Sequence, residues 1–163
     1  MKATQLLKKD HAAVKKLMTA FGRTAATAPR RRQQLIDKIA TELEIHSTIE
    51  EEIFYPAVKR SSGGARLVSE AETEHKKVEH LVSEAQGLDP GSDEIAAKVK
   101  TLHDAVLHHA TEEEREMFPL AEETLRDELN ELGNELAARK RTLARSRLQR
   151  AKRAVKKGIR KVA

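Results

Sequence analysis

Residues 46–56 read HSTIEEEIFYP, and residues 109–119 read HATEEEREMFP. Each stretch places a glutamate four residues after a histidine and ends in an aromatic residue followed by proline. A spacing of four residues puts the histidine and the glutamate on one face of an α-helix, about 5–6 Å apart. The two stretches therefore predict two helices, each of which presents one imidazole and one carboxylate in the same direction.

The similarity between the two stretches belongs to a longer internal repeat, with a shift of about 63 residues. Residues 11–17 (HAAVKKL) correspond to residues 75–81 (HKKVEHL). The histidine that opens each of these segments precedes the histidine of the HxxxE motif by 35 residues in the first half and 34 in the second. Each half is therefore predicted to be a helical hairpin, with a single histidine on its first helix and HxxxE on its second.

The hydrophobic pattern is helical throughout and shows no alternation with a period of two, so the chain is predicted to be all-α. Helix-breaking residues at 22–29, 61–64 and 87–92 end three helices, and a fourth is expected from about residue 93 to residue 118. Connections this short favour antiparallel neighbours and an up-down-up-down four-helix bundle. A fifth helical segment is expected after Pro119, running into a basic tail.

Charge divides the chain into two parts. Residues 1–138 contain 19 basic and 26 acidic residues, whereas residues 139–163 contain twelve basic residues and no acidic one. We therefore expect a bundle over residues 1–120, an additional helix over 121–138, and a basic amphipathic or flexible tail over 139–163. The tail is suited to an anionic partner such as nucleic acid or a membrane surface. Alternatively, it covers acidic surface of the bundle or is a frayed, solubilising extension.

The composition excludes several classes of chemistry and of targeting. The chain contains no cysteine, so disulfides, thiolate zinc sites, iron–sulfur clusters and cysteine nucleophiles are ruled out. The first eleven residues, MKATQLLKKDH, become polar too early for a secretory signal, and no apolar run is long enough to span a bilayer. We expect a cytoplasmic protein.

If the four helices face a common axis, their interior holds four imidazoles and two carboxylates. Burying such a set is costly unless cations compensate it. Imidazole and carboxylate without sulfur suit iron, manganese or zinc, and two carboxylates able to bridge favour a dinuclear centre. The predicted metal ligands are His11, His46, Glu50, His75, His109 and Glu113.

The order H…HxxxE…H…HxxxE over residues 1–120 resembles that of hemerythrin-like proteins. The resemblance implies two iron ions, bridged by an oxo or hydroxo group, with His11 and His46 on different irons and the carboxylates bridging or chelating. Two departures from the oxygen-carrying members weaken a carrier function: Glu79 stands where those carriers have a further histidine, and Glu113 stands in place of an aspartate one residue later.

Tyr55 is the only tyrosine in the chain, and Phe118 is its counterpart in the repeat. In a regular helix Tyr55 would lie about 140° from the face of Glu50. Pro56 removes a backbone donor, so a local π-bulge could return Tyr55 to that face. Tyr55 is thus predicted to contact the metals and to take part in catalysis. Hemerythrin-like proteins with the same HxxxE-x4-YP segment are associated with peroxide breakdown.

The resulting functional hypothesis is a di-iron protein that disproportionates hydrogen peroxide in oxidative-stress defence. A second hypothesis is a module that senses or stores dioxygen, nitric oxide or iron without turnover, and a third is a structural bundle with vestigial ligands. A ferritin-like carboxylate protein is rejected because it requires Glu-x-x-His on two helices, and only Glu72 with His75 has that spacing.

The remaining histidines and glutamates have less definite expectations. Glu79 either touches the site or faces water, and His108 with Glu112 is the rival register to His109 with Glu113. Exposed or supporting positions are expected for the histidines without a match in the repeat, and solvated positions for the other glutamates of the two runs. These residues are His80, His103, His108, Glu51, Glu52, Glu112 and Glu114.

Overall fold

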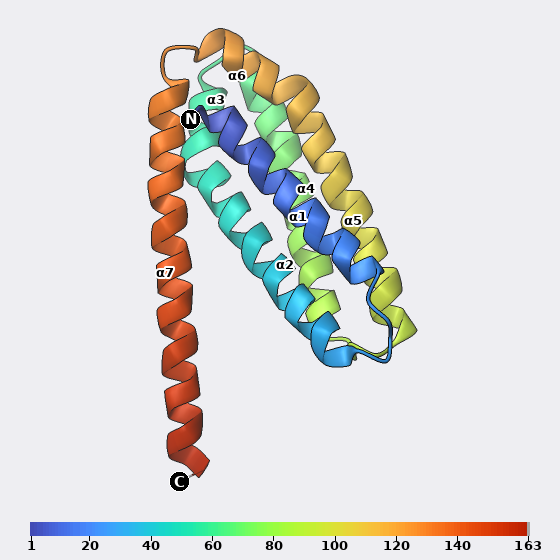
Figure 1. The fold of residues 1–163 in the computed structure, drawn as a ribbon. Coiled ribbons are helices and arrows are strands. Elements are labelled where there is room, and N and C mark those ends of the chain that lie inside the picture. Colours follow the sequence, from blue (N-terminus) through green and yellow to red (C-terminus); the bar gives the residue numbers. More distant parts are fainter. Residues whose placement is uncertain (163) are drawn as a thin grey trace.

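A computed structural model describes the backbone of residues 1–162 and the side chains of residues 1–158. The described residues form helices and turns, without a strand among them. The bundle consists of four long helices whose direction alternates along the chain (Figure 1), which confirms the predicted all-α, up-down-up-down fold. These helices are α1 (Ala3–Gly22), α2 (Pro29–Ile49), α4 (Gly64–Gln86) and α5 (Asp93–Glu112).

The helix ends follow the breakers in the sequence. Pro29 occupies the first turn of α2, where its missing N–H has no helical partner to lose. Gly63 precedes α4 with φ of 82°, a left-handed conformation that favours glycine. The Ser92 hydroxyl accepts a hydrogen bond from the backbone N–H of Ile95 at 3.3 Å and caps α5.

The two HxxxE helices change their hydrogen-bonding pattern at the glutamates of the motif. The π-helical segments η1 (Glu50–Phe54) and η2 (Glu113–Met117) follow α2 and α5, and the short helices α3 (Tyr55–Lys59) and α6 (Phe118–Thr124) continue them. The Tyr55 N–H donates to the carbonyl of Glu50, five residues back. The predicted π-bulge near Tyr55 is confirmed. Its counterpart η2 was not anticipated, although Pro119 removes a donor there as well.

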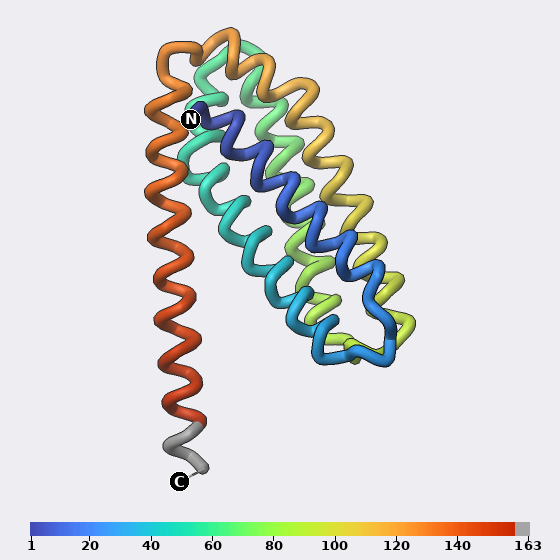
Figure 2. Tube along the Cα trace, in the orientation of Figure 1, coloured from blue at the N-terminus to red at the C-terminus, as the bar shows by residue number. Residues whose placement is uncertain are grey.

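The fifth helix begins later than the sequence indicated. After α6 the chain turns at Leu125, which has φ of −116° and ψ of 21° and buries its side chain in the core. Helix α7 (Leu129–Val162) then runs without a break past residues 138 and 139. It packs against α1 and α2, and its later turns, before the residues drawn in grey, stand away from the bundle (Figures 1 and 2). Side chains of the predicted tail from residue 159 onward lie outside the described part of the structure.

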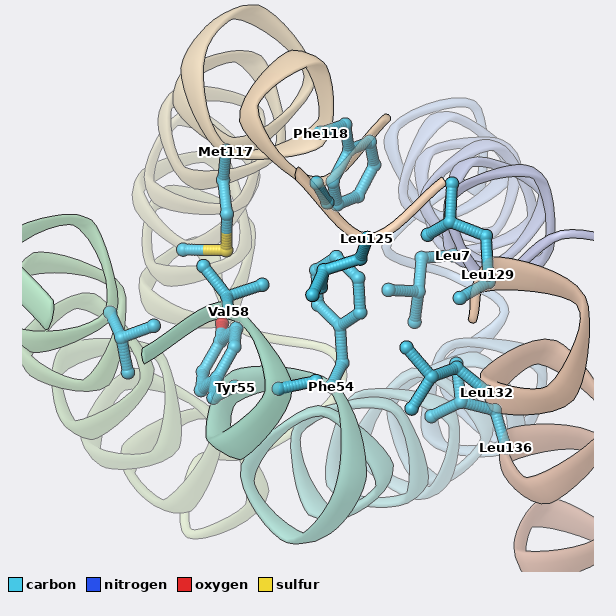
Figure 3. Close-up of a cluster of buried hydrophobic side chains, with 14 of the residues drawn as sticks. Leu7, Phe54, Tyr55, Val58, Met117, Phe118, Leu125, Leu129, Leu132 and Leu136 are labelled. Atoms are coloured by element: carbon cyan, nitrogen blue, oxygen red, sulfur yellow. The ribbon is translucent and has the colours of Figure 1, made fainter. Parts of the chain in front are cut away.

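The apolar core consists of two clusters. One lies at the end of the bundle where α3 and α6 stand, called the closed end below. It contains Leu129, Leu132 and Leu136 of α7 together with Phe54 and Phe118 (Figure 3). The other fills the opposite end and includes Val14, Leu43, Val78 and Val106. Along each long helix the predicted metal ligand lies between residues of these two clusters. Within residues 1–162 no helix combines the length and apolarity needed to cross a membrane.

Candidate metal centre

The six predicted ligands converge in the middle of the bundle. All are buried, with between 0% and 5% of their surface exposed. Donor atoms of His11, His46, Glu50, His109 and Glu113 lie within 4.8 Å of one another. His75 completes the group, because its Nε2 is 3.2 Å from Oε2 of Glu50 and 3.2 Å from Nε2 of His109.

The histidines form two pairs, one from each hairpin. The ring centroids of His11 and His46 are 4.8 Å apart, and those of His75 and His109 are 4.7 Å apart. Between His11 and His109, which belong to different hairpins, the centroid distance is 6.2 Å. The arrangement therefore offers two neighbouring sites with two imidazoles each.

The two carboxylates link these pairs. Glu50 places Oε1 at 3.1 Å from Nε2 of His46 and Oε2 at 3.2 Å from Nε2 of His75. Glu113 places Oε2 at 3.3 Å from Nε2 of His11 and at 3.5 Å from Nε2 of His109. Each glutamate thus spans one histidine of each hairpin, as a bridging carboxylate in a dinuclear centre does.

The buried carboxylates of the cluster favour positive charge beside them. Burial disfavours a charged His46, but Glu50, Asp10 and Glu113 outweigh burial and raise the pKa of His46 to about 10. Burial also opposes a charged His75, and Glu50, Glu51 and Glu113 raise its pKa to about 9. Burial likewise disfavours a charged Glu50, yet His46 and His75 hold its pKa well below the usual value.

The donor atoms themselves test whether metal ions fit. Buried polar atoms normally have hydrogen-bond partners. Among the described residues, Nε2 of His11, both ring nitrogens of His46, Oε1 of Glu50 and Oε2 of Glu113 are buried without one. Most of these atoms point inward, and imidazole nitrogen with carboxylate oxygen is a ligand set for iron, manganese or zinc. The residues therefore fit a metal centre.

Four carboxylates outside the ligand set stand behind the histidines, each facing an Nδ1 atom. Such partners orient a metal-binding imidazole and fix its tautomer. The set follows the repeat. The residue before each first-helix histidine faces the second histidine of the same hairpin, and the residue after the glutamate of each HxxxE motif faces a histidine of the other hairpin. The pairs are Asp10 with His46 (3.7 Å), Glu74 with His109 (2.9 Å), Glu51 with His75 (2.7 Å) and Glu114 with His11 (2.8 Å).

These contacts correct the expectation that Glu51 and Glu114 are merely solvated. Their side chains are 43% and 33% exposed, and one oxygen of each still reaches a ligand histidine. Asp10 and Glu74 were missed as well. The available signal was an acidic residue directly before both single histidines and a second glutamate directly after both metal-facing ones.

Tyr55 is fully buried beside the centre. Its hydroxyl donates to Oε1 of Glu113 at 2.7 Å and lies 3.3 Å from Oε2 of Glu50 and 3.1 Å from Nε2 of His75. Burial, together with Glu50 and Glu113, raises the pKa of Tyr55 well above its usual value, so the phenol keeps its proton beside the two carboxylates. Phe118 takes the equivalent position over His11, with ring centroids 5.8 Å apart.

The other titratable residues stay outside the ligand set. Glu79 is exposed, His80 pairs with Glu84 at 3.3 Å, and His103 is half-buried. His108 is exposed and its Nε2 lies 3.1 Å from Oε1 of Glu74, so the rival register with Glu112 is not adopted. Glu112 and Glu52 instead pair with Arg115 and Arg139.

A small cavity and a groove lie next to the histidines. The cavity has a volume of about 20 Å³ and is bounded by the four histidines and by Val14, Val106 and their neighbours. A groove of about 440 Å³ between α2 and α4 shares Leu43, Ser47 and Val78 with the cavity wall. About 10–15 Å³ suffices for one water molecule, so the cavity suits a molecule of two heavy atoms or fewer.

The chain is similar to several known proteins. Rv2633c, an uncharacterized protein of Mycobacterium tuberculosis, is 33% identical over 147 residues, which cover 85% of each chain. A DNA nickase of Nostoc sp. is 28% identical over 131 residues, which are 80% of this chain and 36% of the nickase. The crystal structure of a hemerythrin HHE cation binding domain-containing protein from Mycobacterium kansasii, an Rv2633c homolog, matches with a TM-score of 0.81 and 28% identity over 93% of both chains.

The family model described as the hemerythrin HHE cation binding domain matches residues 2–121, which contain all six predicted ligands. The repeat, the bundle and the buried cluster of histidines and glutamates all lie within this range. The chain belongs to the hemerythrin HHE cation-binding domain family.

Proposed function

We propose that the centre binds two iron ions and that the loaded protein disproportionates hydrogen peroxide, as a contribution to oxidative-stress defence. The ring pairs suggest that His11 and His46 would hold one iron and His75 and His109 the other, instead of the separate irons that the resemblance implied for His11 and His46. Glu50 and Glu113 would lie between the two. The observation that carries this assignment is the position of each glutamate between histidines of the two hairpins, at 3.1–3.5 Å from their Nε2 atoms.

Two bound irons supply a redox pair that can accept and return two electrons in alternating half-reactions. The chain positions the substrate and the protons around that pair. The cavity admits a molecule of the size of peroxide, and the apolar side chains Val14, Val78 and Val106 exclude bulk water. Glu51, Glu74 and Glu114 hold three of the imidazoles through Nδ1, and Asp10 faces Nδ1 of the fourth, which leaves Nε2 of each ring for a metal.

Tyr55 is the residue we assign to proton handling. Its hydroxyl donates to Glu113 and lies against Glu50 and His75, so it can hold a proton at Oη and offer a hydrogen bond within the buried site. The apolar counterpart Phe118 over His11 means that only the His75 side of the centre has such a group.

The test is oxygen release from hydrogen peroxide by the iron-loaded protein. We expect rapid release, lost together with iron in His109→Ala and retained in His80→Ala, a control whose histidine is exposed on α4. Iron bound by the wild-type protein without oxygen release would contradict peroxide turnover. It would favour sensing or storage of dioxygen, nitric oxide or iron, which reversible dioxygen binding by the ferrous protein would identify.

We also propose that α7 binds nucleic-acid phosphate. Between residues 141 and 157 it carries eight basic residues and no acidic one, and of these only Arg147 pairs with an acidic side chain in the described structure. No aromatic residue is available there to stack on bases, so binding is expected to be independent of sequence and steeply salt-dependent. The Nostoc relative is named a DNA nickase, which is compatible with a nucleic-acid partner.

The test is binding of duplex DNA at two salt concentrations, with the Lys156→Gln/Lys157→Gln double variant as comparison. Weaker binding by the variant and a smaller salt slope are expected. Equal binding by both proteins would contradict the assignment, as would binding only to vesicles containing anionic lipid, which would identify a membrane surface instead.

A further inference from the structure

Helix α7 reaches the metal centre at one point. The ammonium group of Lys140 lies 2.5 Å from Oδ1 of Asp10, and the other oxygen of Asp10 faces Nδ1 of His46 at 3.7 Å. Asp10 is only 8% exposed, so the contact is largely shielded from water. Lys140 therefore binds the carboxylate that stands behind a predicted metal ligand.

The repeat provides an internal comparison for this contact. Glu74 occupies the position equivalent to Asp10 and faces His109 at 2.9 Å. Its second contact is the exposed imidazole of His108, and no lysine or arginine pairs with it among the described residues. The hairpins thus supply equivalent carboxylates, but only the one behind His46 is fixed by a cation from outside the bundle.

Asp10 and Glu74 differ in how closely they approach their histidines, and this difference makes the contact with Lys140 important for Asp10. Glu74 has a longer side chain and reaches Nδ1 of its histidine within hydrogen-bond distance. Asp10 is shorter, remains 3.7 Å from His46, and has one buried oxygen without a hydrogen bond. An aspartate in that state depends on its other oxygen for orientation, and Lys140 is the donor there.

Docking of α7 is strong enough to place Lys140. Leu136 and Leu132, one and two turns before Lys140, lie in the core cluster at the closed end of the bundle. Arg139 forms a bidentate ion pair with Glu52, with N–O distances of 2.6 and 2.9 Å. Arg147 pairs with Glu44 two turns after Lys140. The lysine is therefore held on both sides along its helix.

We propose that Lys140 is a positioning residue of the metal centre and that α7, acting through Asp10 on His46, completes the site that the bundle leaves asymmetric. This inference rests on the proposed binding of metal at the centre. Loss of the lysine leaves Asp10 free to turn away from His46, and the imidazole loses the partner that orients it. Metal should then dissociate faster from that half of the site.

The experiment measures the rate at which ferrous iron passes from the loaded full-length protein to an excess of a coloured chelator. Lys140→Met should release iron about 10- to 100-fold faster than wild type, the range typical for removal of a partner behind a metal ligand. Arg139→Met is the matched control, because it breaks the neighbouring ion pair to Glu52 without touching Asp10. It should release iron at the wild-type rate, and Lys140→Arg should restore most of the loss.

A double-mutant cycle separates positioning from a general loosening of α7. In an Asp10→Asn background, Lys140→Met should no longer change the release rate, because the lysine acts only through that carboxylate. Equal acceleration by Arg139→Met, or an undiminished effect in the Asp10→Asn background, would overturn the proposal. Failure of the wild-type protein to take up iron would instead contradict the proposed metal centre, which keeps the two failures distinct.

Discussion

At Tyr55 a single hydroxyl meets side chains from three segments of the bundle: η1, α4 and η2. It reaches them because η1 advances the chain by a wider turn, with the Tyr55 N–H bonded to the carbonyl five residues back. The phenol donates to Glu113, one of the two carboxylates that lie between the hairpins.

Tyr55→Phe therefore tests the hydroxyl alone. It removes one oxygen atom and preserves the ring that stacks on His75, with ring centroids 5.5 Å apart. We expect iron content to remain at the wild-type level and oxygen release from peroxide to fall about 10- to 100-fold, in the range for lost contacts around a metal site. Iron analysis and an oxygen electrode measure the two quantities. Unchanged turnover would remove Tyr55 from the mechanism.

Residues that repeat could be predicted from the sequence, whereas contacts between repeats could not. The positions of His46 and Glu50 followed from helical spacing and their counterparts in the other half. The reach of Glu51 across to His75 depends on how the two hairpins pack, which spacing along one helix does not determine. Partial exposure of Glu51 also hides its role from any argument based on burial.

Among the helices, α7 packs more closely against the bundle than a solvated basic tail would. Gly133 lies against the start of the chain, where an added Cβ would meet the carbonyl oxygen of Met1 at 2.0 Å and the nitrogen of Ala3 at 2.9 Å. Both neighbours are backbone atoms and cannot swing aside. Only glycine lets α7 approach α1 this closely.

Gly133→Ala is expected to lower the free energy of unfolding by about 1–3 kcal/mol, the usual cost of overpacking. Gly158→Ala is the control within the same helix, because nothing lies within 4 Å of its added Cβ. The control should be neutral or slightly stabilising, since alanine favours a helix by up to about 1 kcal/mol over glycine. Urea unfolding followed by circular dichroism gives both values, and equal stability of the two variants would contradict the close approach.

The elements differ in how well the sequence indicates them. Glycine or proline lies at the end of α1, at the start of α2 and at both ends of α4, so these bounds were predictable within a few residues. The ends of α2 and α5 were not, because both helices pass into π-helical segments before the next breaker. The turn between α6 and α7 has no such marker. It forms because Leu125 and Leu129 both enter the core cluster at the closed end. Tertiary packing, not a local sequence signal, therefore determines this turn.

For the whole molecule, the buried cluster of histidines and glutamates joins the two hairpins, since each glutamate lies between one histidine of either half. Apart from a cation, only protons balance the buried carboxylates, as the raised pKa of His46 at about 10 indicates. Bound metal should therefore hold the halves together and stabilise the folded state by linkage.

Removal of iron by a chelator is expected to lower the midpoint of thermal unfolding, and reloading should restore it. Metal at 100 times its dissociation constant contributes about 2.7 kcal/mol. His109→Ala provides the control, because its melting curve should respond weakly or not at all to added iron. Coincident curves for the loaded and metal-free wild-type protein would show that the bundle does not depend on the centre.

The four carboxylates that face the Nδ1 atoms also indicate how the two halves of the chain are related. Two identical hairpins related by a two-fold axis would supply every ligand and every supporting carboxylate of this centre, because each element of the set has its equivalent in the other half. Gene duplication and fusion of a self-pairing hairpin would thus inherit a working site. Divergence of the two halves would then explain two asymmetries. Tyr55 corresponds to Phe118 in the other half. Lys140 contacts Asp10 and has no equivalent beside Glu74 among the described residues.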